Sequence, residues 1–518
     1  MAFYSRIKRK RLDRAIRTEV HSSLKLKANQ PTPGYSRGLA EKAKRFGYSN
    51  LATVVVSSTI ILLILARTYW SIVTGYLLPD ESYYYNLFIV QKSPLTLYRP
   101  VFHLMYLLFF QGTTNATQLF LRGAVYSSIW GVGCIFCMRL ILGELEITDR
   151  ASALVLISLP LFPVFTVMAL FFVTETFALF FAFLGVLFLI RYLKRSKLLE
   201  LVVGAICLAL ASEIREPYSL LLVGCVLAIP FLKRGAGGVL AIVAIVVFVL
   251  IGALPFGVTA TSLSLGWTDV EAFFVGLGYG FGPLFALLIP VWIFMTIRLR
   301  TNIGRFVTLT MLLALVSFAI TSDLSITGLG GFSIYLSDII RLTSTAVPAA
   351  IGLGYLYSKI RPRYILVALL IYAVAGAAFV PQLGNALQTS QNPTGQPVDR
   401  LSLGYRAPYF RLYELALTAG KTLIIAPGGV RGIIVYASLL PDATLAVVPP
   451  SSRAFAALLA EGWNSIFLYS EGGPLTQASA LGYPAYYRLI LFSGTHGGFD
   501  FKLLWNDSES YAVEILTP

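Results

Sequence analysis

The chain has 518 residues, of which 57% are apolar and 13% charged, and its net charge at pH 7 is +16. Its mean hydropathy is +0.74, and a water-soluble protein of this length cannot bury that much apolar surface. The composition therefore excludes a soluble globular protein and indicates an α-helical membrane protein with several spans.

Most of the positive charge lies in residues 1–50, which hold thirteen Lys and Arg against three acidic residues. A basic segment before the first span stays on the cytoplasmic side, where it faces anionic lipid. The segment is too long to be the basic start of a signal peptide. We therefore expect a cytoplasmic N-terminal arm with membrane lipids as its partners, and no nucleic acid.

The first span is expected at Leu51 to Thr74, so the loop that follows it lies outside the cytoplasm. That loop holds two adjacent carboxylates, Asp80 and Glu81, directly after Pro79. Charged groups between apolar segments mark a functional site, and we interpret Asp80 and Glu81 as catalytic. The alternative is that the two carboxylates only cap a helix that begins after Pro79.

Arg99 and His103 lie at the start of the next apolar run. Val101 to Gly112 is too short to cross a hydrocarbon core of about 30 Å at about 1.5 Å per residue, so we expect a partly inserted helix. Full spans are expected at Thr117 to Leu142 and at Ala151 to Leu170.

Clusters of Arg and Lys further along the chain predict cytoplasmic turns. They lie at residues 191–197, 233–234, 298–305 and 359–363. The alternation of sides then places Glu175, the tip at Glu213 to Glu216, and Arg341 at the outer boundary. Leu199 to Ile214 and Pro217 to Leu232 are short for spans, so the charged tip between them needs a wet cavity. We expect about eleven spans, or thirteen if the short pieces cross.

The composition changes after Val380, where a polar linker leads into alternating strand and helix patterns. Three strands and two helices are expected first, and two further strands at the edges of the sheet. The strands are Thr422 to Ala426, Thr444 to Val448, Ser465 to Tyr469, Phe499 to Trp505 and Tyr511 to Leu516, and the helices are Val430 to Leu440 and Ser452 to Gly462. We therefore divide the chain into a basic arm (1–50), a transmembrane catalytic domain (51–380), a linker (381–400) and an extracytoplasmic α/β domain (401–518).

Two other patterns indicate packing rather than chemistry. Cys134 and Cys137 are three residues apart in an apolar run, with no His or carboxylate at ligand spacing, so a zinc or redox site is not expected. The glycines from Gly276 to Gly282 lie in an apolar helix without a preceding strand, which favours close helix packing over a nucleotide loop.

Several segments, taken together and in order, resemble the GT-C glycosyltransferases. The Pro-Asp-Glu-x-x-Tyr sequence at Asp80 and Glu81 resembles the first-loop motif of that family, and Arg99-Pro100 resembles its basic residue before proline. Thr174-Glu175 before an apolar helix and Arg215-Glu216-Pro217 are similar to later elements. The resemblance covers about residues 50 to 360, and the chain lacks the Trp-Trp-Asp-Tyr-Gly segment of the oligosaccharyltransferase branch.

The resemblance implies transfer of a sugar from a polyprenyl phosphate to a protein, glycan or lipid acceptor outside the plasma membrane. Such a transfer needs a base for the acceptor hydroxyl and positive charge for the departing phosphate. Asp80 is expected to be the base of an inverting transfer, with Glu81 beside it. The residues expected at the donor phosphate and lipid are Arg99, His103, Arg215, Arg341, Glu175 and Glu216.

Other interpretations of these residues stay open. Arg215 has Glu213 and Glu216 beside it for an internal salt bridge, Arg341 suits an interfacial anchor, and His103 suits a hydrogen-bonded helix position. No cofactor is certain, but Glu81 with Glu175 offers the hard oxygen ligands of a divalent metal ion. A transporter or flippase of a lipid-linked sugar is the alternative function, although its charges would gather at the membrane midplane.

Overall fold

The protein is described by a computed structural model. It describes the following residues: 47–77, 81–82, 85–86, 104–170, 172–215, 217–233, 235–253, 273–274, 277, 301–321, 340–370, 373–374, 402–426, 431–446, 461–471, 495–496, 499–506 and 510–516.

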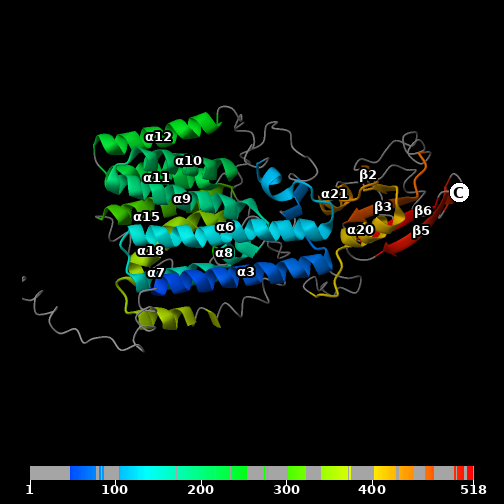
Figure 1. Cartoon of the computed structure of the whole chain (residues 1–518), viewed down its shortest axis with the longest axis horizontal. Helices are drawn as coiled ribbons and strands as arrows, with labels where there is room; N and C mark the ends of the chain where they lie inside the picture. The colour runs from blue at the N-terminus through cyan, green and yellow to red at the C-terminus, as the bar shows by residue number, and fades with distance from the viewer. Residues whose placement is uncertain are drawn as a thin grey trace, which may run out of the picture.

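A bundle of helices forms the larger part of the molecule (Figure 1). Its elements are α3 (Tyr48–Thr74), η2 (Tyr106–Phe110), α6 (Ala116–Glu144), α7 (Asp149–Ser158), η3 (Leu159–Leu161), α8 (Pro163–Leu170), α9 (Thr174–Arg195), α10 (Leu198–Ile214), α11 (Pro217–Leu232), α12 (Ala236–Ala253), α15 (Asn302–Thr321), η6 (Ile340–Thr345) and α18 (Ala346–Tyr357). Among the described residues, α3, α6, α9 and α15 are long and apolar enough to cross a membrane, and shorter apolar helices lie at Tyr218–Pro230 and Ala236–Val247. The predicted helical membrane fold is therefore confirmed.

Helix α3 shows how the apolar sequence divides between the protein core and lipid. Ala52, Val56 and Ile60 are buried at helical spacing, while Leu62 and Leu65 on another face are exposed. An isolated globular protein would not leave such a face uncovered. The exposed face of α3 therefore suits contact with acyl chains.

The predicted span from Ala151 to Leu170 is interrupted. Helix α7 ends at Ser158, a 3-10 turn covers Leu159–Leu161, and α8 then begins at Pro163. Pro160 lacks an N–H group and cannot continue the α-helical ladder, so the chain bends at this point. The two short helices α10 and α11 agree closely with the prediction, because they begin and end within one residue of the expected bounds.

A mixed six-stranded sheet forms the C-terminal part of the described structure, with the order β2-β1-β3-β6-β5-β4. Its elements are α20 (Pro408–Ala419), β1 (Thr422–Ile425), α21 (Arg431–Ser438), β2 (Ala443–Ala446), β3 (Ser465–Glu471), β4 (Thr495–His496), β5 (Phe499–Asn506) and β6 (Ser510–Leu516). β1 pairs in parallel with β2 and β3, and the remaining pairs are antiparallel. The small α/β domain is confirmed.

The last two predicted strands exist but are not edge strands. β6 pairs with β3 on one side and with β5 on the other, and β4 follows β5 at the end of the sheet. The interior position of β6 agrees with its burial, because Tyr511, Ala512 and Val513 are each less than 5% exposed. The predicted helix at Ser452 to Gly462 falls mostly outside the described residues.

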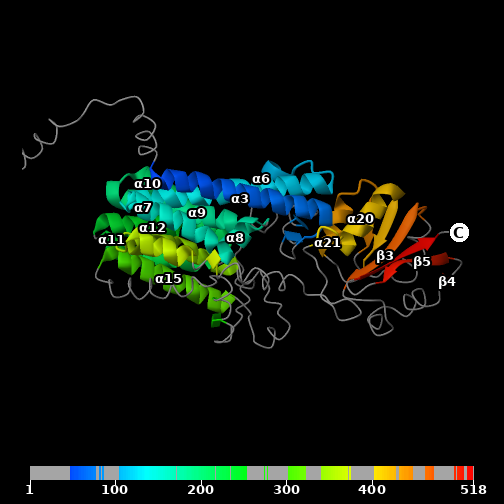
Figure 2. The ribbon, with the colours of Figure 1, turned by 90° about the horizontal axis from the view of Figure 1, so that it is seen from below.

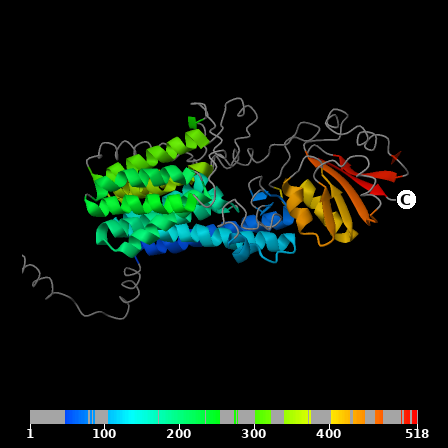
Figure 3. The same ribbon diagram turned by 90° about the horizontal axis from the view of Figure 1, so that it is seen from above.

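The α/β domain lies at one end of the bundle, and its helices α20 and α21 are on the side that faces the bundle (Figures 1 and 2). Helix α3 begins at the opposite end and leads to the domain, as the view from above also shows (Figure 3). The end of α3 next to the α/β domain is also the end from which the chain continues toward Asp80.

Candidate functional site

A buried ion pair joins the first span to the loop that follows it. Arg67 lies near the C-terminal end of α3, and its Nη2 donates to Glu81 Oε2 at 2.6 Å. The two side chains are only 11% and 5% exposed. The Arg67 guanidinium also lies 4.8 Å from the ring centre of Trp70. A charge in a span is costly unless it is paired, so this contact fixes Glu81 against the bundle.

The second oxygen of Glu81 holds a different segment. The Phe172 backbone N–H donates to Glu81 Oε1 at 3.0 Å, which ties the loop to the chain between α8 and α9. Tyr85 packs on the same segment, with its ring stacked on Phe172 at 4.4 Å between centroids. A side chain at Gly123 of α6 would collide with the Tyr85 hydroxyl, whose nearest approach to an added Cβ is 2.1 Å. Glu81 therefore acts as an anchor between three parts of the chain.

A second buried ion pair involves Glu175, three residues after Phe172 in the chain. Glu175, in the first turn of α9, accepts a hydrogen bond from the Arg215 guanidinium at the end of α10. Glu175 is 1% exposed and the Arg215 side chain 17%. The N-terminal end of a helix favours a negative charge, and the arginine completes its neutralisation. The salt-bridge alternative for Arg215 is therefore observed, with Glu175 as the partner.

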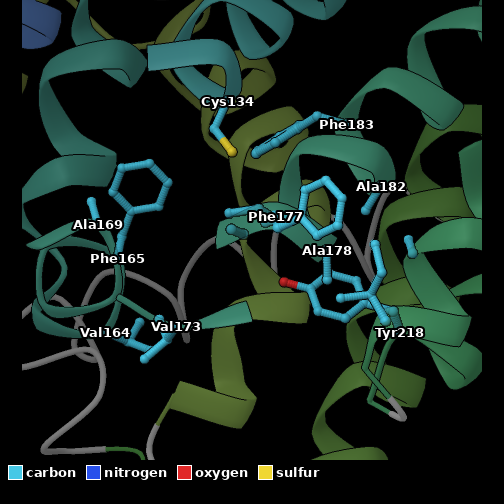
Figure 4. Close-up of a cluster of buried hydrophobic side chains, with 14 of the residues drawn as sticks. Cys134, Val164, Phe165, Ala169, Val173, Phe177, Ala178, Ala182, Phe183 and Tyr218 are labelled. Atoms are coloured by element: carbon cyan, nitrogen blue, oxygen red, sulfur yellow. The ribbon is translucent and has the colours of Figure 1, made fainter. Parts of the chain in front are cut away.

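The 3-10 helix η6 meets this second pair through a tyrosine. The Tyr218 hydroxyl, on α11, donates to Thr343 Oγ1 at 2.9 Å, and its oxygen lies 3.4 Å from the Glu175 carbonyl oxygen. Figure 4 shows Tyr218 next to Ala178 of α9, in a core of apolar side chains. Because Arg341 lies two residues before Thr343 in η6, its backbone is placed at the same corner of the bundle.

Two polar atoms at the start of α9 have no hydrogen-bond partner in the described structure. They are Thr174 Oγ1 and Glu175 Oε2, and both are buried. An unpartnered buried polar atom costs about 1–3 kcal/mol, and such atoms in a native fold call for an explanation. A bound ligand at the start of α9 would supply the missing partners.

The structure brings together predicted residues from separate segments. Glu81, Glu175 and Arg215 are linked through the stretch from Phe172 to Glu175, and the backbone of Arg341 lies beside them. The remaining predicted residues, Asp80, Arg99, His103 and Glu216, lie outside the described residues. Asp80 directly precedes the anchored Glu81 in the chain.

The described part of the site does not fit a divalent metal ion. No group of three or more His, Cys, Asp or Glu side chains gathers among the described residues. Glu81 and Glu175 each face an arginine, so each carboxylate already has a positive partner. The four cysteines are buried free thiols, as expected for packing residues.

Sequence reasoning missed two of the groups that build the site. Arg67 carried a usable signal, because a charged residue twenty positions into an apolar span is a candidate functional residue by itself. The Phe172 backbone N–H carried none, since any residue supplies that group. Its role depends on the three-dimensional approach of the loop to the start of α9.

No family model matches the sequence, and no curated protein matches it. Among solved structures, ArnT from Cupriavidus metallidurans bound to undecaprenyl phosphate is similar over 89% of this chain and 97% of that chain, with a TM-score of 0.58 and 12% identity. The apo state of the same protein is similar over the same shares, with a TM-score of 0.56 and 12% identity.

At this level of identity the likeness concerns the fold. The molecule is an integral-membrane protein with a small extramembrane α/β domain at its C-terminal end. The chain has the same fold as ArnT, and this agrees, for the fold, with the resemblance to the GT-C glycosyltransferases found in the sequence.

Proposed function

We propose that the chain is a membrane glycosyltransferase that moves a sugar from a polyprenyl phosphate to an acceptor on the extracytoplasmic side. The similar ArnT structure binds undecaprenyl phosphate, and it matches this chain over nearly its whole length. In this proposal the chain lies in the plasma membrane, with its N-terminus in the cytoplasm. The acceptor is a protein, a glycan or a lipid.

One observation carries the proposal. Three charged residues from segments far apart in the sequence come together: Glu81 accepts from the Phe172 N–H, and Glu175, three residues further on, pairs with Arg215. They meet next to unpartnered buried polar atoms. Charges that serve only the fold do not need to converge with orphaned groups at one point.

Asp80 is the proposed general base. It takes the proton of the acceptor hydroxyl while the acceptor oxygen bonds to the anomeric carbon of the donor. The bond from that carbon to the phosphate oxygen breaks, and the polyprenyl phosphate leaves with the electron pair. One displacement inverts the anomeric configuration. Glu81 does not react in this scheme, because Arg67 and the Phe172 N–H hold its two oxygens.

Arginines are assigned to the donor phosphate, because a guanidinium makes two parallel hydrogen bonds to one phosphate group. Arg215 and Arg341 are the first candidates, since they belong to the corner built by α10, α11 and η6. Glu175 directs the Arg215 guanidinium, and its buried carboxylate offsets part of the positive charge. The assignment extends to Arg99 with His103 and Glu216, as the sequence predicts.

The test replaces Asp80 with asparagine, which is nearly isosteric but cannot accept a proton. With purified protein and a polyprenyl-phosphate sugar, we expect kcat to fall at least ~10²-fold, the usual scale for loss of a general base. Donor binding and thermal stability should stay close to the parent. Asp442→Asn is the control, because Asp442 is exposed in a turn of the α/β domain, and it should keep full turnover.

Parental turnover in Asp80→Asn would remove this residue from the mechanism. A product with retained anomeric configuration would exclude a single displacement. The sugar and the acceptor are identified by mass spectrometry of surface glycans and polyprenyl phosphates in a deletion strain. Accumulated donor together with one missing sugar is the expected result, and unchanged pools of both would contradict the proposed function.

A further inference from the structure

Side chains of the α/β domain bind the backbone of the segment that leaves the first span. The Tyr436 hydroxyl donates to the Gly75 carbonyl at 2.7 Å. The Leu77 N–H donates to the Tyr409 hydroxyl at 2.8 Å, and that hydroxyl donates in turn to the Leu77 carbonyl at 3.3 Å. The Ala407 N–H donates to the Thr74 carbonyl at 2.8 Å. Backbone groups of Thr74, Gly75 and Leu77 are thus held by one domain.

The tyrosines that make these bonds are themselves fixed by packing. The rings of Tyr409 and Tyr436 are stacked with 5.6 Å between centroids, and Tyr436 is fully buried. The Phe410 ring fills the space over Gly75, where an added Cβ would lie 1.9 Å from its Cγ. The rings therefore leave the backbone at Gly75 little room to move.

The segment held in this way leads directly to the carboxylates. Asp80 follows Leu77 by three residues and precedes Glu81 by one, and Glu81 is clamped by Arg67 and the Phe172 N–H. Leu77, before Asp80, and Glu81, after it, are thus both held by other parts of the chain. One clamp comes from the bundle, and the other comes from the α/β domain.

The Tyr436 hydroxyl is suited to a permanent donor role. Burial, followed by the neighbouring hydroxyls of Tyr85 and Tyr413 and the Glu81 carboxylate, raises the pKa of Tyr436 well above its usual value. The hydroxyl therefore keeps its proton over the whole working range of pH. Its bond to Gly75 does not switch with pH.

From this geometry we infer that Tyr409 and Tyr436 are positioning residues that act on Asp80 through the backbone from Gly75 to Leu77. The inference rests on the proposed function, and it gives the α/β domain a part in the transfer. Displacement of a reacting group by about 1 Å costs rate without loss of substrate binding. Loss of the hydrogen bonds of these two hydroxyls should therefore lower kcat more than it changes KM.

The test uses Tyr409→Phe and Tyr436→Phe, which keep the rings and remove only the hydroxyls. We expect each to lower kcat about five- to twentyfold and to leave the KM for the donor within about twofold, since about 1.4 kcal/mol corresponds to a factor of ten. Tyr413→Phe is the matched control. Tyr413 belongs to the same cluster of rings, but its hydroxyl accepts from the Ala116 N–H of α6 at 3.4 Å, and kcat should stay unchanged.

A double variant separates positioning from a general structural role. Because the tyrosines act through Asp80, Tyr436→Phe should cost nothing further in an Asp80→Asn background. An equal loss in both backgrounds, or an equal loss in Tyr413→Phe, would overturn the inference. Hydrogen exchange gives a readout without turnover, since the Leu77 amide should exchange faster in Tyr409→Phe than in Tyr413→Phe, and equal exchange would contradict the contact's role.

Failure of the inference can be told apart from failure of the proposed function. If the parent protein transfers no sugar, the proposed function is wrong. If the parent transfers sugar and both Tyr→Phe variants keep the parental kcat, the transfer stands and the positioning role falls.

Discussion

Arg67 is a charged residue inside a membrane span, and it needs a partner of opposite charge. A guanidinium in a span must find an opposite charge, and Glu81 meets it at 2.6 Å while both side chains are almost fully buried. Loss of one partner from a buried pair is far more costly than loss of both, because the remaining charge is left uncompensated. The pair is therefore a fixed connection between α3 and the loop.

This asymmetry predicts a strong coupling between the two residues. We expect Arg67→Met or Glu81→Leu alone to lower the free energy of unfolding by about 3–5 kcal/mol. The double variant should lose clearly less than the sum. The measurement is unfolding in detergent, with the coupling energy taken from the double-mutant cycle.

An exposed pair of the same protein provides the comparison. Lys502 and Glu514 join β5 to β6 at 3.2 Å, but the lysine side chain is 62% exposed. Exposed pairs contribute about 0–1 kcal/mol, so Lys502→Met with Glu514→Leu should show a coupling below that of the buried pair. Equal coupling in the two cycles would mean that Arg67 and Glu81 are not a desolvated pair.

Individual site residues could be predicted from the sequence, but not their partners. Glu81, Glu175 and Arg215 stand out because a charge beside an apolar run is rare. Their contacts depend on how α3, α9 and α10 approach one another, which no local pattern records. The sequence suggested the adjacent Glu213 and Glu216 as salt-bridge partners of Arg215, and it gave no sign of the Glu175 partner that the structure shows.

At the scale of elements, the ends of helices follow from local chemistry and their interruptions follow from proline. Basic residues end α9, and Arg215 marks the end of α10, so both bounds were predictable. The position of β6 inside the sheet was not, because its pairing with β3 joins residues 39 to 49 positions apart in the sequence. A strand pattern predicts a strand and says nothing about its neighbours.

Gly75 follows the last residue of α3 and lies against Phe410 of the α/β domain. Its φ is +68°, a left-handed value that costs other residues about 1–2 kcal/mol, and Phe410 occupies the place of a Cβ. Gly75→Ala should therefore destabilise the protein through both effects and make the α/β domain easier to cleave by protease. Thermal unfolding and limited proteolysis measure the two results.

Gly112→Ala separates these effects. Gly112 has a φ of +74°, but an added Cβ would meet no atom within 4 Å. Its substitution should carry only the backbone cost and leave proteolysis of the α/β domain unchanged. If the two alanine variants behave alike, the contact between Gly75 and Phe410 does not hold the domain.

At the scale of the whole molecule, several charged groups gather at the end of the bundle away from the α/β domain. Arg191 and Arg195 at the end of α9 both bind Glu144 at the end of α6, and Asp149 at the start of α7 accepts from the Tyr48 N–H at 2.5 Å. The basic turn predicted at residues 191–197 thus lies at this end of the bundle. Charge counting alone was sufficient for this, because the rule acts on each loop separately.

This distribution of charge predicts the orientation in the membrane. The end with Tyr48, Arg191 and Arg195 should be cytoplasmic, and the α/β domain should lie outside. Ser402 and Ser358 are both exposed and belong to the two opposite ends. The native thiols are buried, so a single introduced cysteine can be labelled against a low background.

In intact cells, an impermeant maleimide should label Ser402→Cys and leave Ser358→Cys unlabelled. Ser358 lies directly before the basic turn of Lys359, Arg361 and Arg363, and a cytoplasmic thiol there is protected until the membrane is opened. Permeabilised cells supply the control, since both thiols should then react. Labelling of Ser358→Cys and protection of Ser402→Cys in intact cells would reverse the orientation. That result would also argue for a cytoplasmic Asp80, because α3, after which Asp80 follows in the chain, ends next to the α/β domain.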